Sequence, residues 1–115
     1  MPLYHNDDQT MLADSAREFM KAQAPVSHLR KFRDMQCKDG FSHELWKEFA
    51  EMGFTGILVK EEDGGLGLGH YEAGIILEEI GRNLSPSPFL TTAVAGVTAL
   101  NGGSADMRAR WLPGI

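Results

Sequence analysis

One stretch of the sequence says most about the fold: EEDGGLGLGHYEAGIILEEIGR, residues 61–82. Its first half is polar and glycine-rich, which predicts a tight turn where glycine supplies positive φ angles. Apolar side chains then recur at helical spacing from Tyr71 to Ile80, and they predict a helix that ends near Gly81. The central expectation is therefore a glycine turn packed beside an amphipathic helix.

Helical periodicity extends over most of the remaining chain. Asn6, Ser42 and Ser104 are residues that commonly cap helix N-termini, and each precedes an apolar stripe. Pro25 ends the first of these stripes, and Gly53 lies where a glycine commonly follows a helix. Together with the helix near residues 71–81, the predicted helices cover residues 7–24, 26–32, 43–52, 89–100 and 105–111.

The segments between these helices carry few signals of a sheet. The apolar run at residues 54–59 fits either a strand or a buried connector, and we favour the connector because no second strand is convincing. Residues 83–88 hold two prolines and two serines and are expected to form a loop. We therefore predict an all-α fold, a bundle of about six helices in one domain over residues 1–115.

Composition excludes several classes of function. The formal net charge is -5, with 16 acidic against 11 basic residues, so nucleic acid is not an expected partner. No apolar run has the roughly 20 residues that span a bilayer, and the N-terminus is too polar for a signal peptide. A single cysteine, Cys37, fits a reducing compartment. A soluble, cytoplasmic protein is therefore expected.

The sequence contains no complete catalytic motif. The glycine turn lacks the third glycine of GxGxxG because His70 stands there, and the P-loop pattern is absent. The acidic residues 61–63 fit a solvated loop better than a general acid or base. Histidine and cysteine spacing does not match a metal site, and Ser85 and Ser87 do not lie in a hydrolase elbow. We predict no catalytic or metal-binding residue and leave cofactor-binding residues unassigned.

The predicted helix at residues 89–100 is unusually rich in small side chains. Phe89, Thr92, Ala93, Gly96 and Leu100 share one face at i, i+3, i+4 spacing. This face fits the wall of an apolar ligand slot and equally a close helix-to-helix contact. The residues alone leave both interpretations open.

Several runs, taken in order and spacing, resemble the N-terminal helical domain of acyl-CoA dehydrogenases. The GGxG turn followed by a helix ending in LEEIGR is the most specific of them. One departure is Lys60, where the family commonly has proline before two acidic residues. The matching residues are Leu45, Trp46, Met52, Gly53, EEDGGLGLG at 61–69, LEEIGR at 77–82, SPSPF at 85–89 and RWLPG at 110–114.

The resemblance implies that this chain is one part of a longer flavoenzyme, with a β domain and a second helical domain beyond it. Such enzymes use FAD to introduce a double bond between Cα and Cβ of an acyl-CoA thioester. They are usually homotetramers and pass electrons to an acceptor such as an electron-transfer flavoprotein. The catalytic base and most FAD contacts lie outside the matched region, whereas Phe89, Thr92, Ala93 and Gly96 would form part of the acyl-pocket wall.

Two alternatives remain at this point. The same helical domain occurs in flavin monooxygenases and nitroalkane oxidases, which the resemblance does not separate from dehydrogenases. The chain also fits a non-catalytic helical module, either a partner subunit or a free-standing interaction domain. In that case the small-residue face at residues 89–100 would be a contact surface for the partner.

Overall fold

The computed structural model describes residues 4–115 and contains only helices and turns over that range. The predicted all-α fold is confirmed, and residues 54–59 are a connector of turns rather than a strand. None of the helices over this range has the length and apolar character needed to cross a bilayer. The helices are α1 (Asp7–Gln23), α2 (Val26–Asp34), α3 (His43–Glu51), α4 (His70–Arg82), α5 (Val97–Asn101) and α6 (Ala105–Trp111), with a π-helical segment at Leu90–Gly96 and 3₁₀ turns at Phe54–Gly56, Glu61–Asp63 and Leu112–Gly114.

The predicted helix caps are confirmed. The Asn6 side chain accepts a hydrogen bond from the backbone N–H of Gln9 at 2.8 Å, and the Gln9 side chain accepts one from the Asn6 N–H at 2.9 Å. Ser42 and Ser104 each accept from the backbone N–H three residues further on. Gly53 follows α3 with φ of +83°, the left-handed region that favours glycine. These caps satisfy backbone groups that helix ends leave unpaired.

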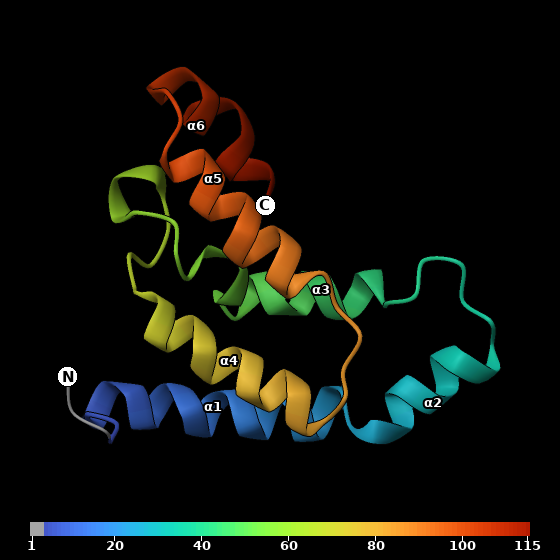
Figure 1. Ribbon diagram of the computed structural model, residues 1–115. Helices are drawn as coiled ribbons and strands as arrows, with labels where there is room; N and C mark the ends of the chain where they lie inside the picture. Colours follow the sequence, from blue (N-terminus) through green and yellow to red (C-terminus); the bar gives the residue numbers. More distant parts are fainter. Residues whose placement is uncertain (1–3) are drawn as a thin grey trace.

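Helices α1 and α4 lie side by side and form the largest helix pair of the fold (Figure 1). Gln9 near the start of α1 donates to Glu72 near the start of α4, at 3.3 Å. Arg17, further along α1, pairs with Glu79, further along α4. The second contact lies further towards the C-terminus than the first on both helices, so α1 and α4 run parallel.

The core lies where α1 and α3 meet the connector that follows α3. The Phe49 and Phe54 side chains are fully enclosed, and the Phe19 ring packs edge-on against both at 5.7 Å between ring centroids. Such edge-to-face contacts are the favoured geometry for aromatic pairs. Helix α2 takes no part in this core, because none of its residues is buried and it projects away from the other helices (Figure 1).

A continuous helical stretch from Phe89 to Asn101 lies on the side of α4 opposite α1 and changes type along its length (Figure 1). Residues Leu90–Gly96 form π-helical turns, and α5 continues as ordinary α-helix. The sequence predicted a plain α-helix here. Phe89, Ala93 and Val97, spaced four residues apart, are the residues of this stretch that enter the core.

Candidate functional site

The structure places the four predicted wall residues on one helix but in two environments. Phe89 and Ala93 are buried in the hydrophobic core, with exposed fractions of 1% and 0%. Thr92 and Gly96 are partly exposed at the margin of the same helix. The first two residues therefore anchor a helix that packs on α4 and on the turn Phe54–Gly56, and the second two remain available to a ligand or to another part of a protein.

Gly96 lies close to the backbone of the preceding turn. A Cβ atom at this position would lie 3.2 Å from the carbonyl oxygen of Thr91, which is tighter than nearly all real Cβ contacts. The helix start is fixed by Pro88, whose carbonyl accepts from the Thr92 N–H at 2.9 Å and from the Thr91 hydroxyl at 3.1 Å. The small side chains of this stretch thus permit the π-helical turn as well as a close approach from outside.

An apolar groove lies beside Gly96, between α5 and α6. It encloses about 620 Å³, and we call it the α5–α6 groove. Two of its large apolar side chains, Met107 and Trp111, are 48% and 52% exposed. The guanidinium of Arg110 lies 5.0 Å from the centre of the Trp111 ring, within cation–π range. The lining residues are Gly96, Leu100, Met107, Arg110, Trp111, Gly114 and Ile115.

The glycine turn is structural, because its backbone N–H groups are already used within the turn. Gly65 donates to the Lys60 carbonyl at 3.0 Å, and Gly67 donates to the Val59 carbonyl at 2.8 Å. Gly64 has φ of +92°, as predicted for a tight turn. A phosphate-binding loop needs free N–H groups that point at the anion. These residues therefore do not fit the pyrophosphate of a dinucleotide cofactor.

The acidic residues before this turn act as surface and packing groups. Glu61 and Glu62 are exposed. Asp63 pairs with Arg108 of α6, with 3.4 Å between Oδ2 and Nε, and both side chains are mostly shielded from solvent. This ion pair ties the glycine turn to the helix beside the groove.

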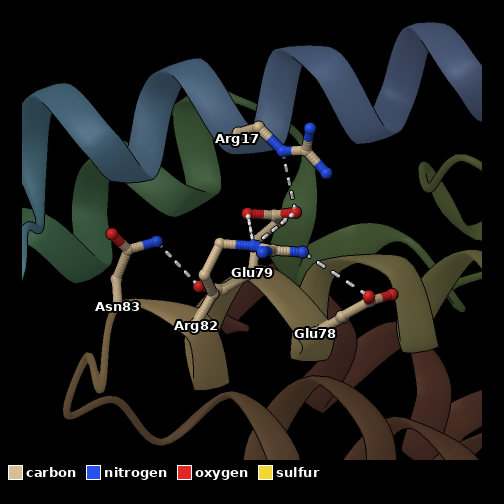
Figure 2. Close-up of polar contacts among 5 residues, drawn as sticks. All are labelled: Arg17, Glu78, Glu79, Arg82 and Asn83. Carbon is tan, nitrogen blue, oxygen red and sulfur yellow. Dashed lines mark hydrogen bonds and ion pairs between the residues drawn. The ribbon is translucent and has the colours of Figure 1, made fainter.

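A buried carboxylate in α4 was missed by the sequence interpretation (Figure 2). The Glu79 side chain is only 3% exposed, and its oxygens lie 3.4 Å from Nε of Arg17 and 3.2 Å from Nε of Arg82. Both arginines are about half exposed, so they cover the carboxylate from the surface. Glu79 lies four residues after Ile75 and three after Ile76, so it shares the apolar face of its helix. That placement in the sequence was a signal that the carboxylate would be buried.

Several of the remaining titratable side chains form local pairs. No group of three or more histidine, cysteine, aspartate or glutamate side chains over residues 4–115 could hold a metal ion. His5 hydrogen-bonds the Tyr71 hydroxyl at 2.9 Å, and His43 pairs with Asp39 at 2.9 Å. Burial, and secondarily the charge of a nearby lysine, lowers the pKa of His28 below its ordinary value.

Comparison with known proteins gives one consistent result. Residues 6–115 match the family model described as acyl-CoA dehydrogenase, N-terminal domain. The acyl-CoA dehydrogenase FadE12 of Mycobacterium tuberculosis is 35% identical over 73% of this chain and 22% of its own length. The mitochondrial isobutyryl-CoA dehydrogenase of Dictyostelium discoideum is 31% identical over 93% of this chain and 24% of its own length. The (2S)-methylsuccinyl-CoA dehydrogenase of Cereibacter sphaeroides is 31% identical over 94% of this chain and 20% of its own length.

The coverage of these relatives is asymmetric. Nearly the whole of this chain is matched in two of them, yet it spans only about a fifth to a quarter of their length. No solved structure matches the chain significantly. The comparisons therefore concern the domain described above, and most of each relative lies beyond it.

Proposed function

The chain belongs to the acyl-CoA dehydrogenase family, and we propose that it forms the N-terminal domain of a longer FAD-dependent acyl-CoA dehydrogenase. That enzyme oxidises the Cα–Cβ bond of an acyl-CoA thioester and releases the enoyl-CoA. The observation that supports this proposal is the match to the family's N-terminal domain over residues 6–115. The relatives named above are dehydrogenases of acyl-CoA thioesters, which favours that class over an oxygen-dependent flavoenzyme.

In this proposal the helix from Phe89 to Asn101 supplies part of the wall of the acyl pocket. Thr92 and Gly96 lie at the partly exposed margin and make the direct contact with the acyl chain. Phe89 and Ala93 form the layer behind them and hold the helix in place from the core. A wall of threonine methyl, alanine and glycine suits an apolar chain, because it offers close contact without a charged group.

The flavin is proposed to bind elsewhere in the longer protein. FAD, when bound, accepts the hydride that leaves the β carbon of the thioester. The glycine turn of this domain does not fit the FAD pyrophosphate, since its N–H groups bond to carbonyls at residues 56–61. The catalytic base is likewise proposed to lie in another domain, which leaves this domain the task of shaping the pocket.

Further features of the longer enzyme follow from the same proposal. It forms a dimer or homotetramer and passes its electrons to an acceptor such as an electron-transfer flavoprotein. It works in the cytoplasm, which agrees with the single cysteine of this chain. Acyl-CoA and the remainder of the same polypeptide are the two partners proposed for this domain.

Spectroscopy of the longer protein tests the proposed reaction. We expect a flavin absorption band that bleaches when an acyl-CoA thioester is added without oxygen, together with formation of the enoyl-CoA. A protein that carries no flavin even after incubation with FAD would contradict the proposal. Oxygen consumption with a nitroalkane, without bleaching by any thioester, would assign the chain to an oxidase instead. A flavin-free protein that binds a second dehydrogenase chain would assign it to the non-catalytic class.

Substitution at the helix margin tests the proposed wall. Thr92→Phe narrows the pocket, so we expect KM for long acyl chains to rise by about tenfold or more while short chains are affected less. Thr98→Phe, on an exposed position of the same helix, is the matched control and should leave chain-length preference unchanged. Equal effects of the two substitutions on all chain lengths would remove Thr92 from the wall.

A further inference from the structure

We propose that α2 and the turn after it, residues 26–40, form a docking surface for the anionic face of a lipid bilayer. We call these residues the basic arm. Attachment to a membrane surface goes beyond the reaction proposed above and does not depend on it. Neither the family match nor the named relatives assign a role to this segment.

Charge is distributed unevenly between the basic arm and the rest of the chain. The arm has a net charge of +2, from four basic and two acidic side chains: Arg30, Lys31, Arg33, Lys38, Asp34 and Asp39. The rest of the chain has 7 basic and 14 acidic residues and so carries a net charge of -7. A basic segment on an otherwise acidic chain indicates an anionic partner for that segment.

Three cations of the arm are available to such a partner. Arg30, Lys31 and Lys38 are exposed, and none of them belongs to an ion pair over residues 4–115. The two carboxylates of the arm are already engaged, one by Arg33 at 3.0 Å and the other by His43 at 2.9 Å. The arm therefore presents mainly positive charge to solvent.

The basic arm stands apart from the acidic parts of the domain. Helix α2 has no buried residue, and it projects away from the other helices together with the segment that leads to α3 (Figure 1). Asp7 and Asp8 begin α1, whose opposite end leads into the arm, so they lie more than about 20 Å from it along that helix. Salt screens charges over about 8 Å, so an anionic surface in contact with the arm would repel these aspartates only weakly.

Apolar side chains of the arm add a second contribution. Leu29 and Phe32 share one face of α2, are half-buried, and line a hollow of about 240 Å³ together with Cys37. Met35, just after α2, is 60% exposed. Cations beside apolar side chains are typical of helices that lie in the interface of a membrane.

The size of the basic arm favours a bilayer over a protein as the anionic partner. Helix α2 has nine residues and is therefore about 14 Å long. A specific protein interface buries roughly 800 Å² on each partner, which is a large area for one short helix and a turn. A charged bilayer needs no matched surface, because the potential of its headgroups attracts any lysine or arginine that comes near.

Vesicle sedimentation with the longer protein tests the inference. We expect the partition constant on phosphatidylcholine vesicles with about 30% phosphatidylserine to be at least about tenfold higher than on pure phosphatidylcholine. Arg30→Gln with Lys31→Gln should lower it by about tenfold. Lys47→Gln with Lys60→Gln removes the same charge at exposed positions outside the arm and should lower it less than about twofold. Equal binding to both vesicles, or equal losses with both pairs of substitutions, would overturn the inference.

A fluorescent label locates the contact without altering the charge of the arm. A nitrobenzoxadiazole dye is attached to Met35→Cys, or to Met11→Cys on α1 as the control, in a Cys37→Ser background. Met35 and Met11 are 60% and 68% exposed, so both thiols can be labelled. On the anionic vesicles we expect the emission at position 35 to rise about twofold or more and the emission at position 11 to stay unchanged. Equal changes at the two positions would contradict docking through the arm.

Poly-glutamate is the probe for an acidic protein surface as the alternative partner. At the same concentration of negative charge as the phosphatidylserine, it should leave most of the protein on the vesicles. Complete displacement would assign the arm to acidic proteins and overturn the inference. None of these measurements uses a flavin or a thioester, so failure of the proposed reaction remains distinguishable from failure of the inference.

Discussion

The ion pairs around Glu79 lead to a quantitative prediction about stability (Figure 2). Arg17→Met removes one cation but keeps the aliphatic part of the side chain. The Arg17 contact is long, at 3.4 Å, and the Arg17 side chain is 56% exposed, so the loss should be about 1 kcal/mol in the free energy of unfolding. Arg82→Met should cost a similar amount, because Arg82 is 52% exposed and Arg17 still covers the carboxylate.

The double variant should cost more than the sum of the two single variants. With both guanidinium groups gone, the 3% exposed Glu79 side chain has no cation beside it. Leaving a buried charge without its partners costs about 3–5 kcal/mol, against about 2 kcal/mol for the summed single losses. Glu79→Gln in the double-variant background should restore most of that stability, because a neutral amide has a far smaller desolvation cost.

Urea unfolding followed by far-UV circular dichroism measures these differences through the midpoint and the slope of the transition. Glu78→Gln is the matched control. Glu78 also pairs with Arg82 but is 67% exposed, so its replacement should change the free energy of unfolding by less than about 0.5 kcal/mol. A double variant whose cost is merely additive, or one that Glu79→Gln fails to stabilise, would refute the account of a buried carboxylate held by two cations.

Three further predictions concern single positions. Gly65→Ala should lower the free energy of unfolding by about 3 kcal/mol or more, because its Cβ would overlap the carbonyl and Cβ of Val59. Gly64→Ala meets open space and should lower it by only about 1 kcal/mol, because of the positive φ at that position. Equal losses of stability in thermal melts of the two variants would contradict this. The pKa of His28 is lower in the folded state than its ordinary value of 6.5, so on acidification the unfolded state takes up a proton before the folded state does. The free energy of unfolding is therefore highest above pH 6.5 and falls as the pH drops from that value towards the pKa of the folded state. A His28→Gln variant should show less of this acid-side loss in urea unfolding at pH 7.5 and 5.5, and an unchanged loss would assign it to other groups. Asn6→Ala should lower stability by about 1 kcal/mol by removing the α1 cap, as a fall in Tm would register.

The features that the sequence predicted well depend on neighbouring residues. Asn6, Ser42 and Ser104 were identified as caps because a cap bonds to the backbone only three positions away. Gly53 was identified because one backbone conformation after a helix favours glycine. The resemblance to acyl-CoA dehydrogenases identified the family and the domain, since the order and spacing of several motifs are more specific than the pattern of any single helix.

The features that the sequence did not predict depend on distant or collective contacts. Glu79 and Arg17 are 62 positions apart, so no local pattern pairs them. The π-helical segment at residues 90–96 was also not predicted, because the sequence there has the spacing of an ordinary helix. The α5–α6 groove exists only once α6 has folded back beside α5. Tertiary packing decides each of these cases, and periodicity does not record it.

The parallel arrangement of α1 and α4 has a consequence for synthesis on the ribosome. Parallel neighbours cannot form a hairpin, and the nascent chain must add the residues between Gln23 and His70 before the pair can assemble. Until then the apolar stripe of α1, which includes Ala16 and Met20, has no α4 to cover it. Contacts of such long sequence separation form late and leave apolar surface exposed to aggregation. Helix α1 therefore keeps part of its apolar stripe uncovered until α4 has been synthesised.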